Sequence, residues 1–297
     1  MSQATVSTKT YTLSSGHKMP AIGLGTKKGD DREQTIRIIQ DAIESGYRHI
    51  DTAAMYETED MVGEAIRRSG VKREDLFVTS KVWCTDLIKE RVLPAFEKSL
   101  ATLNVDYIDL YLIHWPIAFE SPQSSPPKVI ENYDFVETWK ELEKLVESGK
   151  VKSIGVSNFN IEKLERLLKH CKIPPTVNQV ELHPYLAQPD LKKFCDENKI
   201  ILTGYSPLGR SIEPRIDQDK VIVELADKYQ VSSAQIILSW AVQRGTAVVP
   251  RSANKERQLK NITLVQLDED DKKKVDDLNK NHRYINPEKM WGVKNVF

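Results

Sequence analysis

The stretch GYRHIDTAAMYETEDMVGEAIRR, residues 46–68, contains a short apolar run that ends on Asp51 and a longer segment with helical spacing. A change from period two to period 3.6 is typical of a β-strand that leads into an α-helix. A carboxylate at the edge of an apolar core is costly unless a positive group meets it. The stretch therefore predicts one βα unit and a basic partner for Asp51, with Tyr56 lying five residues beyond it.

The same strand-then-helix pattern recurs along the chain. Its strand candidates are residues 21–26, 50–53, 76–82, 108–114, 151–158, 176–182, 200–207 and 246–252. Alternating β and α segments predict a parallel sheet, and eight units in about 250 residues fit a closed (β/α)₈ TIM barrel. A doubly wound open sheet is the alternative. Residues 11–21 predict a β-hairpin before the repeat. Because no linker divides the chain, we expect a single domain over residues 1–297.

The composition argues against several classes of function. Lys plus Arg and Asp plus Glu each number 43, giving a net charge of +0, so no overall field attracts nucleic acid or an anionic membrane. No apolar run approaches the ~20 residues that span a bilayer. Three scattered cysteines without a CxxC pair argue against a disulfide framework or a zinc site. We expect a cytoplasmic protein with no metal and no obligate protein partner.

Polar residues that can move protons stand at the ends of three successive predicted strands. Asp51, Lys81 and His114 end these strands, and parallel barrel strands open into one shared mouth. We expect Asp51 to pair with Lys81. A lysine ammonium ~4 Å from the Tyr56 phenol would favour phenolate by ~4 kcal/mol, at most about three pKa units. With His114 orienting a carbonyl oxygen, the site would protonate an alkoxide after a cofactor delivers hydride.

Glycines near the N-terminus resemble a dinucleotide-binding fingerprint but lack the spacing and the following helix that this fingerprint requires. GLGTKKG, residues 23–29, has GxGxxxG spacing and is not followed directly by a helix, so we interpret it as a tight turn. Groups suited to a nicotinamide stand at later strand ends: Ser157, Asn158, Gln179 and Tyr205. Arg251, Ser252 and Arg257 lie near a predicted helix N-terminus, which favours a phosphate. If this site binds the 2′-phosphate of a dinucleotide, the preferred cofactor is NADP(H) rather than NAD(H).

Other polar and aromatic residues allow two interpretations. Trp83 and Trp115 follow Lys81 and His114 closely, so they either pack under loops or wall an apolar substrate pocket. The irregular residues 115–134 and 207–218 are either binding loops at the mouth or, for 121–130, a tolerated surface insertion. His170 and His183 lack metal-ligand spacing and are interpreted as structural.

Three ordered motifs resemble signatures of the aldo-keto reductase superfamily: residues 46–63, KSIGVSNF at 152–159 and VPRSANKER at 249–257. The match runs from about Tyr11 onward. The resemblance implies a barrel that binds NADPH in extended form, as in fungal-type carbonyl and aldehyde reductases. It implies a catalytic tetrad of Asp51, Tyr56, Lys81 and His114. The implied cofactor contacts are Thr26, Asp51, Ser157, Asn158, Gln179, Tyr205, Ser206, Leu208, Arg251, Ser252, Arg257 and Asn261.

The chain departs from the family pattern in four places. Lys27 stands where the family usually has an aromatic residue of the substrate pocket, so Lys27 either admits anionic substrates or turns into solvent. Lys260 stands where an acidic residue often meets the adenine. The loop after the seventh strand is short, which suggests an open cofactor channel. In the third signature the usual lysine is arginine.

The leading expectation is NADPH-dependent reduction of a small-molecule aldehyde or ketone, with Tyr56 as general acid. Two alternatives remain. Lys81 would serve a barrel lyase or aldolase as a Schiff-base amine, although Asp51 should keep that amine protonated. A non-catalytic NADPH-binding regulatory protein on the same fold is the other alternative.

Overall fold

The computed structural model describes residues 4–121, 127–210, 212–294 and 296–297. Within them, parallel strands pair in chain order from β4 to β11 in one eight-stranded sheet. The strands are β4 (Leu24–Gly25), β5 (His49–Asp51), β6 (Phe77–Val82), β7 (Ile108–Ile113), β8 (Val151–Ser157), β9 (Val177–Glu181), β10 (Ile201–Tyr205) and β11 (Ala247–Val248). Each lies within or beside a predicted strand segment.

Hydrogen bonds between the first and last strand regions close this sheet. The Val248 amide donates to the Ala21 carbonyl, and the Gly23 amide donates to the Val248 carbonyl, each over 2.9 Å. A parallel bridge between Ile22 and Val248 lies between them. The barrel prediction is therefore confirmed, and the open-sheet alternative is wrong.

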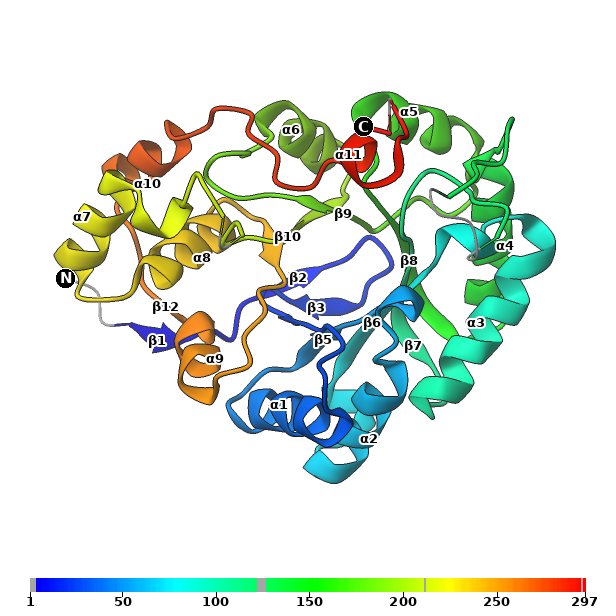
Figure 1. The fold of residues 1–297 in the computed structure, drawn as a ribbon, viewed down its shortest axis with the longest axis horizontal. Coiled ribbons are helices and arrows are strands. Elements are labelled where there is room, and N and C mark those ends of the chain that lie inside the picture. The colour runs from blue at the N-terminus through cyan, green and yellow to red at the C-terminus, as the bar shows by residue number, and fades with distance from the viewer. Residues whose placement is uncertain (1–3, 122–126, 211, 295) are drawn as a thin grey trace.

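Helices alternate with the strands and lie outside them (Figure 1). They are α1 (Arg32–Glu44), α2 (Glu59–Ser69), α3 (Lys89–Leu103), α4 (Phe135–Glu147), α5 (Ile161–His170), α6 (Pro189–Glu197), α7 (Lys220–Tyr229), α8 (Ser233–Gln243) and α9 (Lys255–Ile262). Side-chain caps mark several starts, such as Asp134 on α4 and Ser232 in a capping box on α8. Beyond the repeat, α10 (Glu269–Asp276) and α11 (Pro287–Trp291) were not predicted.

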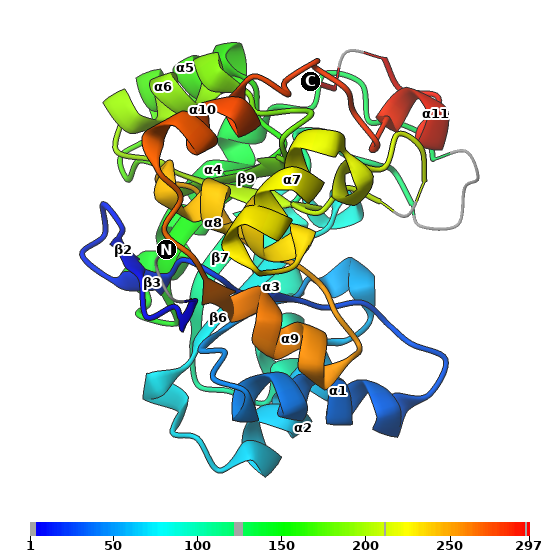
Figure 2. The same ribbon diagram turned by 90° about the vertical axis from the view of Figure 1, so that its left-hand side faces the viewer.

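The N-terminal hairpin closes one end of the barrel. Strands β2 (Thr10–Thr12) and β3 (Lys18–Pro20) pair antiparallel, as predicted. Leu13 and Met19 are buried and pack with Phe77 and other side chains of the barrel interior. In Figure 2 the hairpin and α11 lie on opposite sides of the molecule, so the other end of the barrel is left for the C-terminal residues. A further pair, β1 (Thr5–Val6) with β12 (Thr263–Leu264), was not predicted.

Gly23 and Gly25 of GLGTKKG allow neighbouring parts of the chain to approach closely. A Cβ on Gly23 would lie 2.7 Å from His49 Nδ1, and a Cβ on Gly25 would lie 2.8 Å from the Val249 carbonyl oxygen. The tight-turn interpretation is wrong, because residues 24–25 form strand β4 and a loop then runs to α1. These glycines are needed where the barrel closes on itself.

The described residues contain neither a membrane-spanning helix nor a cluster of metal-binding side chains. None of the helices there has the length and apolar character to cross a membrane. No group of three or more His, Cys, Asp or Glu side chains in this part of the chain is arranged to hold a metal ion.

Candidate active site

The strand register brings the predicted acid, base and imidazole onto one face. Asp51 lies opposite Thr79, and Lys81 is two residues beyond Thr79. Lys81 lies opposite Leu112, and His114 is two residues beyond Leu112. Since side chains alternate along a strand, steps of two keep all three groups inside the barrel. The stagger follows from the tilt of strands in a closed barrel.

Asp51 and Lys81 form the predicted ion pair. The Lys81 ammonium lies 2.6 Å from Asp51 Oδ1 and donates to the Thr52 carbonyl over 2.9 Å. Both side chains are buried. Burial lowers the pKa of Lys81, but the Asp51 carboxylate and Tyr56 outweigh it and leave that pKa above its usual value. Lys81 is therefore a fixed, charged ammonium. This state disfavours Schiff-base chemistry, which needs the neutral amine.

Tyr56 lies on a 3₁₀ turn, Ala54–Tyr56, between β5 and α2. Its hydroxyl oxygen is 3.5 Å from His114 Nε2, and the Lys81 nitrogen is 5.1 Å from its ring centroid. Burial raises the pKa of Tyr56, and the charge and hydrogen bond of Lys81 only partly counter it, so the net direction is upward. The sequence predicts a lowered pKa for Tyr56, and that prediction is wrong. The burial of the phenol decides the sign, and Tyr56 keeps its proton at neutral pH.

His114 is neutral in this environment. Burial and the nearby Lys81 charge hold its pKa well below the usual value. Its Nε2 faces the Tyr56 hydroxyl, and among the described residues Nδ1 has no hydrogen-bond partner. A neutral imidazole and a protonated phenol therefore lie side by side above a buried ammonium, an arrangement that suits a carbonyl oxygen accepting from both.

Hydrogen bonds join the residues predicted to contact a nicotinamide. The Tyr205 hydroxyl donates to Asn158 Oδ1 over 2.8 Å, and Asn158 Nδ2 donates to the His114 carbonyl over 3.0 Å. Ser157 Oγ donates to the Gln179 carbonyl over 2.7 Å. Gln179 Nε2 also donates to Asp51 Oδ2 over 2.7 Å, a contact the sequence did not suggest. These residues thus lie directly beside the tetrad.

The residues predicted to bind the phosphates and adenosine lie farther along the chain. Ser206 and Leu208 follow β10, while Arg251 and Ser252 lie between β11 and α9. Arg251 and Arg257 are exposed, and neither guanidinium has an ion-pair partner among the described residues. Arg257 is in the first turn of α9, where the helix dipole favours an anion.

Four further positions singled out in the sequence differ in their surroundings. Asn261 is buried on α9. Lys260 pairs with Glu256 over 2.7 Å, so its charge is already balanced. The Thr26 amide donates to the Asp51 carbonyl, which places the exposed Lys27 next to the mouth.

Trp83 contacts His114, and other aromatic side chains pack together beside Trp83. The Trp83 ring centroid is 5.0 Å from that of His114. Trp291, from α11, lies 6.0 Å from Trp83, 5.0 Å from Trp115 and 5.4 Å from Phe119. We call Trp83, Trp115, Phe119 and Trp291 the aromatic cluster. Trp291 was missed because the chain after α10 has no hydrophobic period, although Asn286 followed by Pro287 is a helix-start signal.

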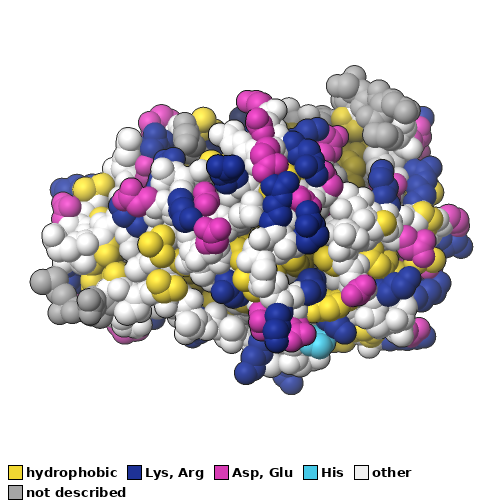
Figure 3. Space-filling view, turned by 90° about the horizontal axis from the view of Figure 1, so that it is seen from below, with side chains coloured by type: hydrophobic (Ala, Val, Ile, Leu, Met, Phe, Trp, Pro, Cys, Tyr) yellow, Lys and Arg dark blue, Asp and Glu magenta, His cyan; other side chains and the backbone are white. Residues whose placement is uncertain are grey.

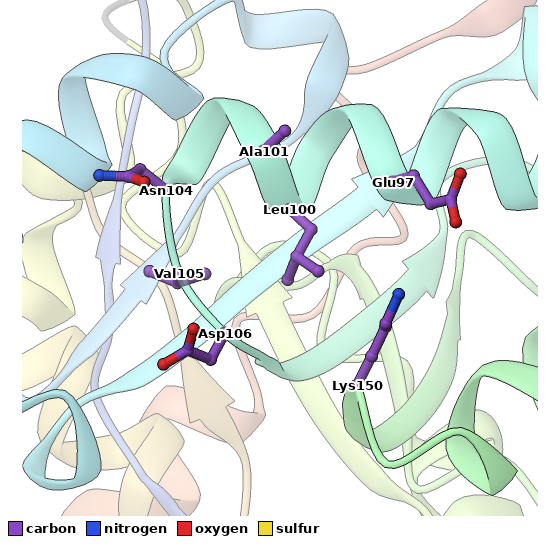
Figure 4. A pocket seen from close by; sticks show the side chains of 7 residues that line it. All are labelled: Glu97, Leu100, Ala101, Asn104, Val105, Asp106 and Lys150. Carbon is purple, nitrogen blue, oxygen red and sulfur yellow. The ribbon is translucent and has the colours of Figure 1, made fainter.

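A surface depression elsewhere does not belong to this site. It is lined by Glu97, Leu100, Ala101, Asn104, Val105, Asp106 and Lys150 (Figure 4). Asp106 precedes β7 and Lys150 precedes β8. The depression therefore lies at the N-terminal ends of the strands, away from the tetrad.

Comparisons with known proteins agree with this geometry. Residues 21–280 match the profile of the Aldo/keto reductase family. The 9,11-endoperoxide prostaglandin H2 reductase of Trypanosoma cruzi is 44% identical over 274 residues, covering 92% of each chain. Mouse aldo-keto reductase family 1 member A1 is 44% identical over 93% of this chain and 90% of its own. Glyoxal reductase of Bacillus subtilis is 42% identical over 95% and 97%. This chain belongs to the aldo/keto reductase family.

Proposed function

We propose that this protein is an NADPH-dependent oxidoreductase that reduces aldehydes and ketones to alcohols. The arrangement of Tyr56 and His114 carries the proposal: a protonated phenol lies 3.5 Å from a neutral imidazole, beside a lysine held by Asp51. The similar proteins named as a glyoxal reductase and a prostaglandin H2 reductase support reductive chemistry.

The tetrad residues have distinct tasks in this proposal. The nicotinamide, when bound, supplies the hydride. His114 donates a hydrogen bond from Nε2 and orients the carbonyl oxygen toward Tyr56. Tyr56 gives its proton to that oxygen as negative charge develops on it. Lys81 stabilises the phenolate that remains, and Asp51 holds Lys81 charged and in place. The products would be the alcohol and the oxidised dinucleotide, and Tyr56 would regain its proton from solvent.

The chain's own residues suit a nicotinamide dinucleotide, and the family generally uses NAD(P)H. The amides of Asn158 and Gln179 with the Ser157 hydroxyl suit the carboxamide, and Tyr205 offers a ring face. Ser206 and Leu208 would hold the pyrophosphate side, and Thr26 and Asn261 would contact the sugar and adenine. Arg251, Ser252 and Arg257 would hold the 2′-phosphate, which is why we propose NADPH rather than NADH.

Replacing Arg257 with alanine tests this cofactor preference. A hydrogen bond to a charged group contributes about 1.5–3 kcal/mol, so the Kd for NADPH should rise roughly 10- to 150-fold. The Kd for NADH should change little, because NADH lacks the 2′-phosphate. Titration of tryptophan fluorescence with each dinucleotide measures both values.

Lys255→Ala is the matched control for Arg257. Lys255 lies on the same helix, but its ammonium binds Asp41 and Glu44, so its loss should leave the NADPH Kd nearly unchanged. If Arg257→Ala weakens both dinucleotides equally, the 2′-phosphate does not bind at Arg257.

A panel of aldehydes and α-dicarbonyls, followed by the absorbance of NADPH, tests the activity itself. We expect turnover that stays level between about pH 7 and 9, because Tyr56 keeps its proton and His114 stays neutral throughout that range. Binding of NADPH without turnover on any carbonyl would favour the non-catalytic alternative. Borohydride trapping of a carbonyl on Lys81 would favour the lyase.

We also propose that the whole chain acts as one domain in the cytoplasm, without an obligate protein partner. The barrel closes between residues 21–23 and Val248, and α11 returns to its mouth. Free cysteines, including buried Cys84 and Cys195, suit a reducing compartment. Basic and acidic side chains are interspersed over the face in Figure 3, which suits a small-molecule substrate better than nucleic acid.

A further inference from the structure

Glu181 is a buried carboxylate that the tetrad does not use. It is the last residue of β9, two residues beyond Gln179, so it shares the interior face with Gln179 one layer nearer the mouth. Its side chain is 0% exposed. A carboxylate in such a place must find donors. The donors are not on a neighbouring strand: they come chiefly from the chain after α10.

Residues 282–294, the C-terminal segment, supply those donors. The backbone amides of Tyr284 and Ile285 donate to Glu181 Oε1 and Oε2 over 2.7 and 3.1 Å. His183 Nε2 lies 3.1 Å from Oε1, and burial lowers the pKa of His183, which leaves a neutral ring that donates. One carboxylate thus holds two successive backbone amides, and hydrogen bonds to an ionised acceptor are the stronger kind.

Neighbouring contacts keep the C-terminal segment in the same place. The Arg283 guanidinium carbon lies 3.8 Å from the Phe297 ring centroid, and Arg283 Nη1 lies 3.9 Å from Glu181 Oε2. The Tyr284 hydroxyl donates to the Pro214 carbonyl, in the loop that follows β10. The segment is therefore attached to the barrel through Glu181 and to the loop after β10 through Tyr284.

The anchored residues lead directly to the aromatic cluster. Ile285 packs against that cluster. Helix α11 begins two residues later and ends at Trp291, whose ring contacts Trp83 and Trp115. Trp83 in turn contacts His114. The residues that Glu181 holds therefore lead within the same short segment to Trp291, which reaches His114 through Trp83.

We propose that Glu181 is a positioning residue for the carbonyl substrate. By holding the amides of Tyr284 and Ile285, it fixes Trp291 over the mouth and so sets how tightly the apolar part of the substrate binds. Glu181 itself touches neither the reacting atoms nor the tetrad. The inference rests on the proposed carbonyl reductase function and identifies a determinant of substrate affinity in it.

A double-mutant cycle between Glu181→Gln and Trp291→Leu tests this path. Each single variant should raise KM for an apolar aldehyde about tenfold and leave kcat within about twofold, the pattern of lost ground-state binding. The NADPH Kd should stay within about threefold in both variants. If Glu181 acts through Trp291, the double variant should have the KM of Trp291→Leu alone. If the two single-variant increases in KM multiply in the double variant, the proposal is wrong. It is also wrong if Glu181→Gln leaves KM unchanged.

Ile285→Pro provides a second route if Glu181→Gln fails to fold. It removes one amide donor to Glu181 and leaves β9 intact, so KM should rise in the same direction with kcat retained. Glu197→Gln, an exposed glutamate at the end of α6, is the control and should match the wild type.

Tryptophan emission separates failure of this inference from failure of the proposed function. Loosening the C-terminal segment should expose Trp291 and shift the emission of Glu181→Gln to the red, whatever the activity. If the wild type reduces no carbonyl, the function fails. An unshifted emission together with wild-type KM removes Glu181 from its role while the function stands.

Discussion

Replacement of Tyr56 by phenylalanine should lower kcat for carbonyl reduction by about 10³-fold, within the range that positioned proton donors contribute. The variant lacks only the hydroxyl that lies 3.5 Å from His114 Nε2. Without it, the alkoxide has no donor with a proton in the right place, and the adjacent Lys81 ammonium is already committed to Asp51 and Thr52. NADPH binding should remain near normal. The decrease of NADPH absorbance gives kcat, and fluorescence titration gives Kd.

Tyr107→Phe is the matched control for this change. Tyr107 precedes β7, at the end of the barrel opposite the tetrad, so losing its hydroxyl should leave kcat unchanged. Activity close to the wild type in Tyr56→Phe would remove Tyr56 from the role of general acid. Loss of NADPH binding together with activity would point to a damaged cofactor site instead.

Replacement of Lys81 by methionine should impair both activity and stability. Removing one partner of a buried ion pair leaves an uncompensated charge, which costs about 3–5 kcal/mol of the free energy of unfolding. Here the Asp51 carboxylate would remain buried, with Gln179 as a donor but no cation. kcat should fall at least about 10²-fold, because the Tyr56 phenolate would lose the ammonium that stabilises it. Urea denaturation and steady-state kinetics measure the two losses separately.

A second substitution separates these two effects. In the double variant Asp51→Asn with Lys81→Met, no buried charge is left unpaired, so most of the lost stability should return. Activity should not return, because no ammonium faces Tyr56. A double variant that regains turnover would show that Lys81 is dispensable for the chemistry. One that stays as unstable as Lys81→Met would show that the ion pair is not the source of the loss.

Much of the barrel follows from local patterns. Strand-then-helix periodicity depends on near neighbours in the chain, so the eight strand segments, the following helices and the hairpin around Gly16 were predictable. The meeting of Asp51, Lys81 and His114 was predictable as well, because parallel strands present their ends at one edge and side chains alternate. The number of units and the family resemblance predicted a closed barrel rather than an open sheet. The hydrogen bonds that close it join Ala21, Gly23 and Val248 at opposite ends of the repeat, and local spacing did not predict them.

The electrostatics of the site were likewise only partly predictable from the sequence. The sequence predicted the sign of each charge and the pairing of Asp51 with Lys81. It did not predict the direction of the Tyr56 pKa, because burial of the phenol depends on every element packed around it, and burial outweighs the nearby ammonium. The bond from Gln179 to Asp51 was unforeseen for a similar reason, since β9 faces β5 only once the barrel closes.

The amino-acid order thus specified the repeating βα units, the proton-transfer residues at their ends and the family signatures, all of which depend on short-range spacing. The folded chain alone brought Trp291 against Trp83, whose ring contacts His114, and gave Glu181 the amides of Tyr284 and Ile285 as partners. About a hundred residues separate Glu181 from Tyr284, and the residues between them carry no periodic signal that pairs the two. Such contacts arise because a buried carboxylate must be satisfied by whichever donors the completed barrel brings within reach.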